Sequence, residues 1–262
     1  MDLASIAGEL LTARKTRSYV EPPSGRDSDF SIHDGYAVGA LLHANALGSG
    51  YTQRGVKLGF TNETVWNALG LDSPFWSPIY AETVTDRHEL SLDPFVEPRL
   101  EPEIVVGLGS ALSHGAGRDD VAAAIAWAAV GFEIVQSHYR NWEMQPADAI
   151  ADGGLHGILV VGEHHAVGAS PAEALAAVEV ALMHDDRTVA SGTGANPLGG
   201  PVAAVTWLLR LPGVDEIPAG SVITTGSLTP AFPLAAGETW QVSTAGARPL
   251  GDLRLTLAAA AR

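Results

Sequence analysis

The stretch LEPEIVVGL, residues 100–108, decides how the rest of the chain is interpreted, because an apolar strand pattern begins there with two acids. Glu101 and Glu103 are separated by one residue. Side chains at positions i and i+2 of a strand lie on the same face, about 6.5–7 Å apart along the chain. The two carboxylates can therefore converge on one cation. The alternative is an edge strand on which both acids are solvated.

A second acid lies inside an apolar pattern, Glu133 in VGFEIV at 130–135. A buried carboxylate normally pairs with a base, takes up a proton or binds a metal, and no Lys or Arg lies close in sequence. Three carboxylates without cysteine and without a nearby HxxxH or HxH pattern favour Mg²⁺ or Mn²⁺ over zinc. The alternative places Glu133, solvated, at the end of a strand.

Composition restricts the classes of function. The 262 residues, 46% hydrophobic and 17% charged, predict one globular domain over 1–262 with a helical N-terminal segment at about 1–50. The longest apolar stretch, 121–132, is shorter than the roughly 20 residues that a membrane helix requires. The absence of cysteine and of a secretion signal predicts a cytoplasmic protein. A net charge of −15 disfavours nucleic acid, and it requires a local positive centre in any site for an anionic metabolite.

Apolar spacing and the positions of Gly and Pro predict both helices and strands, without a linker or a repeat between them. The predicted helices are 2–16, 34–48, 62–70, 117–129 and 198–210. The predicted strands are 56–61, 79–84, 103–108, 132–137, 157–161, 177–183, 221–225, 239–242 and 253–257. The pattern indicates mixed α and β structure.

The residues resemble the 2-keto-4-pentenoate hydratase / 4-oxalocrotonate decarboxylase family, part of the fumarylacetoacetate hydrolase superfamily. The resemblance runs from about Tyr36 to Leu257. The segments that carry it are VKLGFT at 56–61, EPEIVVGL at 101–108, GFEIVQSHY at 131–139, DAIADGGLHG at 148–157, SGTGANPLGGPVAAVTWL at 191–208 and AGSVITTGSL at 219–228. It implies an α+β fold, a mixed β-roll like the superfamily's C-terminal domain, wrapped by helices and assembled as a homo-oligomer.

The resemblance also implies a ligand set and a catalytic lysine. The family's E-x-E motif, followed about thirty residues later by an acid in a strand, corresponds to Glu101, Glu103 and Glu133, which inherit the role of metal ligands. Lys57 matches the active-site lysine of the K-[IVM]-G-[LF]-T motif, although it could also be a surface lysine at a strand end. Asp152 matches the aspartate of the A-D-N motif, but Gly153 replaces the asparagine, so a structural role is as consistent as a catalytic one.

Three further positions follow from the resemblance. Thr225, Gly226, Ser227 and Leu228 match a turn that lines the family's pocket, where backbone N–H groups can bind a carboxylate. Family hydratases usually carry an aspartate where this chain has Phe75, which puts hydration in doubt unless Asp72 or Glu82 substitutes. His33, followed by Asp34, is the nearest equivalent of the base pair of hydrolytic relatives.

The second glycine-rich turn, which contains Gly192, Gly194, Leu198 and Gly199, is interpreted as a tight connection before a helix near Pro201. His138 and His156 are further candidates, each more simply explained as a packed histidine.

The resemblance implies a metal-dependent lyase that hydrates a 2-hydroxy-2,4-dienoate to a 4-hydroxy-2-oxo acid. The alternatives are decarboxylation of a 2-oxo-enedioate, C–C hydrolysis of an acylpyruvate, and a catalytically silent homologue that binds metal or supports a partner enzyme. The expected partners are a small carboxylate substrate, other copies of the chain and a partner enzyme, but neither a membrane nor nucleic acid.

Overall fold

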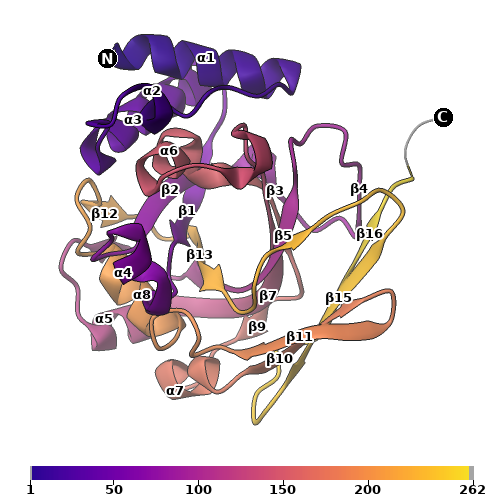
Figure 1. Cartoon of the computed structure of the whole chain (residues 1–262). Coiled ribbons are helices and arrows are strands. Elements are labelled where there is room, and N and C mark those ends of the chain that lie inside the picture. The colour runs from indigo at the N-terminus through magenta and orange to yellow at the C-terminus, as the bar shows by residue number, and fades with distance from the viewer. Residues whose placement is uncertain (1, 260–262) are drawn as a thin grey trace.

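The computed structural model describes residues 2–259 and begins with three helices. These are α1 (Leu3–Thr16), α2 (Pro23–Arg26) and α3 (Ile32–Gly48). The side chain of Asp2 accepts a hydrogen bond from the N–H of Ala4, which caps α1. Ser31 and Asp34 form a reciprocal capping box at the start of α3. Together with α6 these helices lie at one end of the molecule, above the sheets in Figure 1.

The main sheet has nine strands that run in mixed directions. Its central order is β2-β1-β13-β5-β7-β8-β3, with β14 beside β5 and β9 beside β7. Two pairs are parallel, β1 with β13 and β3 with β8. The bounds are β1 (Gln53–Gly59), β2 (Phe75–Tyr80), β3 (Val84–Thr85), β5 (Arg99–Leu108), β7 (Ile125–Val135), β8 (His156–Val161), β9 (His165–Ala166), β13 (Val222–Ser227) and β14 (Phe232–Pro233).

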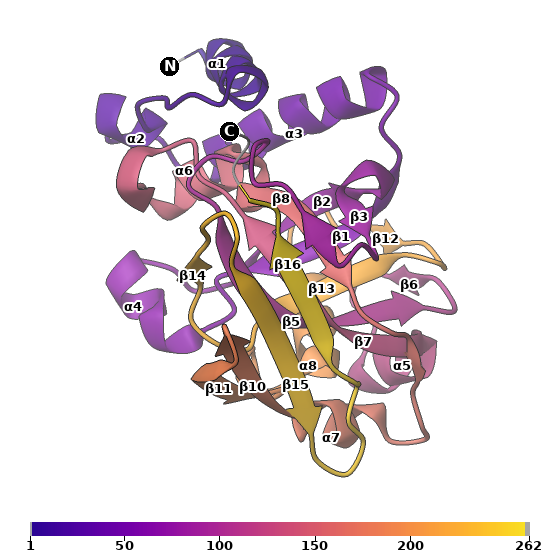
Figure 2. The ribbon, with the colours of Figure 1, turned by 90° about the vertical axis from the view of Figure 1, so that its right-hand side faces the viewer.

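A second sheet packs beside the first, with the order β11-β10-β15-β16-β4. Figure 2 shows β15 and β16 crossing in front of the main sheet. Its strands are β4 (Glu89–Leu90), β10 (Glu179–His184), β11 (Arg187–Thr193), β15 (Thr239–Ala245) and β16 (Leu253–Leu257). A small ribbon joins β6 (Leu112–Ser113) to β12 (Glu216–Ile217).

The remaining helices are short and cover the outside of the sheets. They are α4 (Trp66–Leu69), α5 (Arg118–Ala124), α6 (Pro146–Ala151), α7 (Pro171–Ala176) and α8 (Pro201–Leu208). The 3₁₀ turns are η1 (Glu63–Val65), η2 (Ala81–Thr83), η3 (Arg140–Trp142) and η4 (Gly153–Leu155). Among residues 2–259 no helix is long and apolar enough to cross a membrane. The fold is a mixed β-roll wrapped by helices, as the resemblance predicts.

Side chains of β5 and β7 alternate between two environments. Leu100, Ile104, Val106 and Phe132 belong to the large core between the sheets and α8. The opposite face, called the inner face below, carries Glu101, Glu103 and Glu133 together with Val105 and Ala129. Val105 and Ala129 pack with Ile79, Leu159, Val161 and Val222 inside the curl of the sheet. The inner face is therefore apolar at its base and acidic above.

Two of the predicted elements are wrong. The helix predicted at 117–129 ends at Ala124, and β7 begins at Ile125, because residues 125–135 pair along β5. The strand predicted at 79–84 is replaced by β2, which ends at Tyr80, and a 3₁₀ turn over 81–83. In the first of these places, pairing with a distant strand outweighs local propensity. The prediction also missed α6, α7 and β11, whereas the strand predicted at 253–257 is confirmed.

Candidate metal centre

The three glutamates meet on the inner face, each offering an oxygen within 4.8 Å of the others. The register of β5 and β7 explains this, because Glu101 lies directly opposite Glu133 and Glu103 lies opposite Gly131. Directly paired side chains share a face, and the pleat returns Glu103 to the face of Glu101. The solvated-strand alternative is therefore wrong for Glu103 and Glu133, which are 1% and 0% exposed.

Glu103 is buried, and only one of its two carboxylate oxygens accepts a hydrogen bond. Its Oε2 accepts a hydrogen bond of 2.8 Å from the N–H of Gly226, and its Oε1 has no hydrogen-bond partner. Burial and the neighbouring charge of Glu133 raise the pKa of Glu103 well above its ordinary value. A side chain at position 226 would collide with Thr61 Oγ1, since a Cβ would lie 2.0 Å from it at φ +110°. Only glycine can bring this N–H to the carboxylate.

Glu133 is buried with two basic partners. Lys57 Nζ lies 3.0 Å from its Oε2, and His156 Nδ1 lies 2.9 Å from its Oε1. Burial alone would raise the pKa of Glu133, but the charges and hydrogen bonds of Lys57 and His156 outweigh it and hold the pKa at about 2. Glu133 is therefore ionised at neutral pH.

Glu101 is the partly exposed member of the three glutamates. Its carboxylate is withdrawn from water far enough that desolvation raises its pKa, although Lys57 and a hydrogen bond from Ser227 oppose that rise. Because the other two glutamates are buried, the centre meets solvent on the side of Glu101.

These donors fit a hard divalent cation. All three are carboxylates, the type of ligand that Mg²⁺ and Mn²⁺ prefer. The unpartnered Oε1 of Glu103 and the raised pKa values of Glu101 and Glu103 are what an acidic cluster shows without its cation, because a nearby positive charge would favour the ionised forms. Glu101, Glu103 and Glu133 are the residues that would hold it.

Lys57 lies on the inner face at only 3% exposure, so its interpretation as a surface lysine is wrong. In a flat sheet β1 and β7, three strand positions apart, would be about 14 Å apart. The curl of the sheet brings Lys57 within reach of Glu133. Burial would lower the pKa of Lys57, but the three glutamates outweigh it and raise the pKa. Lys57 is therefore a buried cation beside the three glutamates.

Phe75 stands beside Lys57, a contact that the sequence did not predict. Lys57 Nζ lies 5.9 Å from the centre of the Phe75 ring, and that ring meets Phe60 at 5.0 Å. Gly154 closes the same wall, since a Cβ there would lie 2.7 Å from Ser77 Cβ, 3.0 Å from Phe75 and 3.4 Å from the Lys57 side chain. Where family hydratases carry an aspartate, this chain therefore places the apolar ring of Phe75 next to the ammonium group of Lys57.

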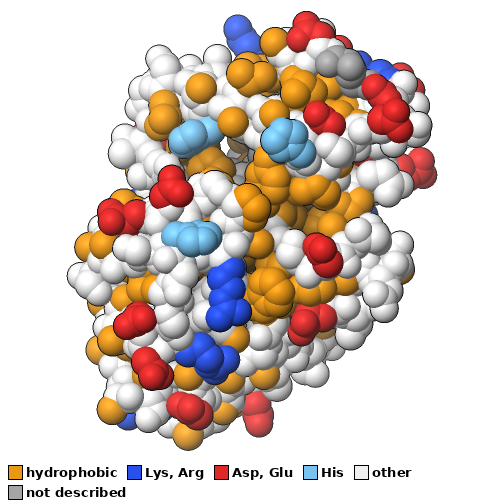
Figure 3. Space-filling view, turned by 90° about the vertical axis from the view of Figure 1, so that its left-hand side faces the viewer, with side chains coloured by type: hydrophobic (Ala, Val, Ile, Leu, Met, Phe, Trp, Pro, Cys, Tyr) orange, Lys and Arg blue, Asp and Glu red, His pale blue; other side chains and the backbone are white. Residues whose placement is uncertain are grey.

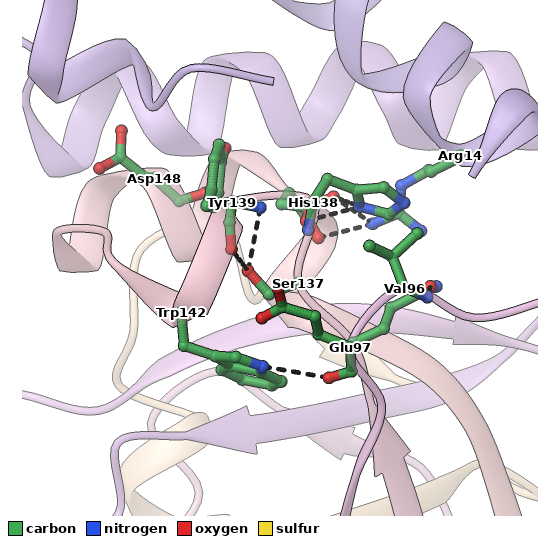
Figure 4. Close-up of polar contacts among 10 residues, drawn as sticks. Arg14, Val96, Glu97, Ser137, His138, Tyr139, Trp142 and Asp148 are labelled. Carbon is green, nitrogen blue, oxygen red and sulfur yellow. Dashed lines mark hydrogen bonds and ion pairs between the residues drawn. The ribbon is translucent and has the colours of Figure 1, made fainter. Parts of the chain in front are cut away.

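Asp152 is fully buried, and both of its oxygens are engaged. Its Oδ2 lies 2.8 Å from His138 Nδ1, and its Oδ1 lies 2.8 Å from a guanidinium nitrogen of Arg14. Figure 4 shows Arg14 and His138 side by side. Burial would raise the pKa of Asp152, but Arg14 and His138 lower it. This geometry supports the structural role that the sequence left open.

The segment 225–228 comprises the end of β13 and the residue after it. Thr225 Oγ1 donates to the carbonyl of Ile104, and the Leu228 N–H donates to the carbonyl of Pro102. With the Gly226 N–H bound to Glu103, the segment shapes and supports the ligands. Substrate binding by Thr225, Gly226, Ser227 and Leu228 remains a prediction.

The other proposed proton carriers lie elsewhere. His33 is exposed on the first turn of α3, and its neighbour Asp34 is used in the capping box with Ser31. Asp72 and Glu82 are exposed, and Glu82 accepts the Thr52 N–H. Their contacts give none of them a place among the glutamates, and catalysis by His33 has no geometric support here.

Sequence reasoning gave too little weight to His156. It bridges Glu133 to Thr83 Oγ1, with 2.9 Å to each. Burial lowers its pKa, against the opposing effect of Glu133. The sequence feature that could have indicated His156 is its position four residues after Asp152, inside the segment DAIADGGLHG that resembles the family. Nothing local in the sequence pointed to Thr83.

Several curated proteins match most of the chain, among them the following two. A 2-hydroxyhexa-2,4-dienoate hydratase of Comamonas testosteroni is 32% identical over 235 residues, covering 87% of this chain and 88% of that protein. A 4-oxalocrotonate decarboxylase of a Pseudomonas species is 29% identical over 240 residues, covering 90% and 92%. No protein-family model matches.

Many solved structures share the fold, among them the following two. The 4-oxalocrotonate decarboxylase from Pseudomonas putida G7, complexed with magnesium and adipate, superposes with a TM-score of 0.88 at 25% identity over 97% of both chains. A fumarylacetoacetate isomerase/hydrolase-like protein from Oleispira antarctica gives a TM-score of 0.63 at 19% identity, over 79% of this chain and 93% of that one. With the carboxylate cluster and the roll, these matches show that the chain belongs to the 2-keto-4-pentenoate hydratase / 4-oxalocrotonate decarboxylase family.

Proposed function

We propose that the chain is a divalent-metal-dependent lyase that hydrates a 2-hydroxy-2,4-dienoate to a 4-hydroxy-2-oxo acid. The observation that carries the proposal is the convergence of Glu101, Glu103 and Glu133 within 4.8 Å, with buried Lys57 beside them. The related hydratase of 32% identity supports the reaction type.

Each residue of the centre has a distinct task in this proposal. The glutamates hold Mg²⁺ or Mn²⁺, and the bound cation supplies Lewis-acid polarisation of the 2-oxo group. Lys57, kept protonated by the surrounding acids, binds the anionic end of the substrate. Phe75 and Gly154 exclude water from the side of Lys57, which strengthens the attraction between the ammonium and a carboxylate. His156 and Thr83 fix Glu133.

A second candidate reaction, decarboxylation of a 2-oxo-enedioate, is favoured by Phe75. The ring occupies the place of a residue that could move protons during the addition of water, whereas loss of CO₂ needs no attacking water. The C–C bond to the departing carboxylate breaks, and its electron pair enters the conjugated system toward the 2-oxo group. The structural neighbour that binds magnesium and adipate, a six-carbon diacid, is a decarboxylase.

The test follows both reactions on one preparation. Metal-stripped protein is supplied with Mg²⁺, the loss of dienol absorbance of 2-hydroxypenta-2,4-dienoate is measured, and CO₂ is measured from 2-oxo-hex-3-enedioate. Glu103→Ala should abolish activity, because it removes a buried ligand. Glu163→Ala, at an exposed loop acid, is the matched control and should keep it.

Metal-dependent formation of the hydroxy-oxo acid, lost in Glu103→Ala alone, supports hydration. CO₂ from the diacid without conversion of the dienoate establishes the decarboxylase instead. Pyruvate from an acylpyruvate indicates the hydrolase, and tight Mg²⁺ binding without any turnover indicates the silent homologue. Homo-oligomer formation, the use of Mn²⁺ and a cytoplasmic location stay predictions.

A further inference from the structure

A cavity of about 220 Å³ lies at the seam between the two sheets, bordered by β9, by α7 and by the turn between β15 and β16. Figure 2 shows this turn next to α7. His165 on β9 pairs with Ala128 of β7, which belongs to the core outside the roll, whereas Glu133 of β7 faces inward. The cavity therefore lies on the side of the main sheet opposite to the metal centre. We call it the seam pocket, lined by residues 165–168, 171, 174, 175 and 248–250.

Most of the lining of the seam pocket is apolar. Leu175 and Leu250 belong to the large core and are each 4% exposed, and Val167 and Pro249 add further apolar surface. The volume is below the roughly 300–1,000 Å³ of sites for drug-sized molecules. The pocket therefore suits a compact ligand with an apolar body.

Of the lining residues, all within 2–259, only two have polar side chains, and both are basic. Arg248 lies against Gly168, where a Cβ would collide with the guanidinium. His165 Nε2 faces Gly251, where a Cβ would lie 3.2 Å from it. The segments 165–168 and 248–251 thus contact each other at both ends. These two contacts bring the imidazole and the guanidinium to the same cavity.

Neither basic group has a partner within the part of the chain that the structure describes. His165 Nε2 is enclosed and makes no hydrogen bond. Arg248 forms no ion pair with a carboxylate of residues 2–259, and none of the lining residues is acidic. An enclosed polar atom without a partner is unfavourable. In a chain of net charge −15, two basic groups without an acid are suited to an external anion.

We propose that the seam pocket binds a small aliphatic carboxylate, of the size of butyrate. The carboxylate accepts hydrogen bonds from the Arg248 guanidinium and from the N–H that His165 carries on Nε2 in one of its neutral tautomers. The hydrocarbon chain packs on Leu175 and Leu250. Inorganic phosphate would use the basic groups but leave these leucines uncovered. Because the pocket is separate from the glutamates, the inference does not rest on the proposed function.

Calorimetric titration of the Mg²⁺-loaded protein with butyrate, acetate and inorganic phosphate tests the site. Butyrate should bind about tenfold more tightly than acetate, because two further CH₂ groups are buried. It should also bind more tightly than phosphate. A carboxylate can also reach the metal centre, so the butyrate titration is repeated with Glu103→Gln. This variant changes the metal centre but not the seam pocket and should keep butyrate binding.

Arg248→Met should weaken butyrate binding at least about tenfold, the effect expected of a charged hydrogen bond, and leave Mg²⁺ affinity unchanged. His165→Phe, which keeps a ring without an N–H, should act in the same direction. His164→Phe is the matched control for the histidine, because the His164 ring stacks on Trp127 at 3.6 Å and does not line the pocket. Arg254→Met, at an exposed arginine of β16, is the control for the arginine. Both controls should keep butyrate binding.

Three results would overturn the proposal. One is the absence of butyrate binding by folded wild-type protein. Another is butyrate binding that Glu103→Gln loses and Arg248→Met keeps, which would place the ligand at the metal centre. The third is tighter binding of phosphate than of butyrate, which would make the pocket a site for inorganic anions.

Discussion

His156 uses both ring nitrogens, one on Glu133 and one on Thr83, at 2.9 Å each. The Glu133 carboxylate that this histidine contacts cannot rotate freely. Its oxygens therefore point in fixed directions before a cation binds. Partners behind the ligands of a metal site commonly tune its affinity. At the scale of single residues, the contacts behind the glutamates therefore matter as much as the glutamates.

Removing this support should weaken metal binding. We expect His156→Ala to lower Mg²⁺ affinity by about 10–100-fold, because Glu133 loses its orienting hydrogen bond. Thr83→Val should act in the same direction with a smaller effect, since it frees the other ring nitrogen. Calorimetric titration of metal-stripped protein measures both. The exposed His88→Ala is the control, and unchanged affinity in His156→Ala would contradict the role.

Glu103 should make the metal-free protein less stable as pH rises. Its pKa is raised in the folded chain, so the unfolded chain releases this proton first and stability falls as pH climbs from the ordinary range toward the folded pKa. Metal-free Glu103→Gln, which lacks this titration, should exceed wild type at pH 7 by about 1–3 kcal/mol. Urea unfolding with a chelator at pH 5 and pH 7 measures the difference. A less stable variant at pH 7 would refute the assignment.

At the scale of elements, α1 is tied to the active-site wall through one side chain. Arg14 reaches Asp152 from the last turn of α1, and Asp152 begins the turn that carries Gly154 against Lys57 and Phe75. His138, just after β7, holds the other side of the same carboxylate. The three elements position the wall together, although none of these groups contacts the glutamates.

Cutting this link should destabilise the protein without removing the metal site. Arg14→Met should cost about 1–3 kcal/mol, because it leaves the buried Asp152 with one basic partner fewer. The melting temperature should fall by about 2–4 °C per kcal/mol, and amide exchange over 151–155 should accelerate. Arg26→Met, which breaks an exposed pair with Glu9, should cost less than about 1 kcal/mol. Equal losses in the two variants would contradict the link.

At the scale of the molecule, the centre depends on how the main sheet curls. Lys57 on β1 reaches Glu133 on β7 across two intervening strands. The N-terminal helices lie over one end of the roll (Figure 1), and the second sheet covers the outer face (Figure 2). Figure 3 shows acidic side chains spread over the surface, with few basic ones on the face turned to the viewer. Lys57, by contrast, lies inside the fold beside the glutamates.

The sequence alone determined the parts of the protein that depend on local pattern. Two acids at alternate positions of an apolar strand and a third inside another predicted the ligand set, and the spacing of the motifs identified the family and thereby the roll. Strand alternation is a local property of the backbone, so it could be read from LEPEIVVGL. The active-site role expected of Lys57 followed only from the resemblance, and its burial beside Phe75 came from the structure.

Tertiary structure decided whatever depends on contacts between distant segments. Residues 125–129 form a strand because β5 pairs with them, against the helical pattern of the local sequence. Asp152 is held in place because Arg14, 138 residues earlier, meets it. Thr83 behind His156 becomes visible only when the sheet is curled. Sequence spacing fixes which face a side chain occupies, but the partner across that face comes from packing.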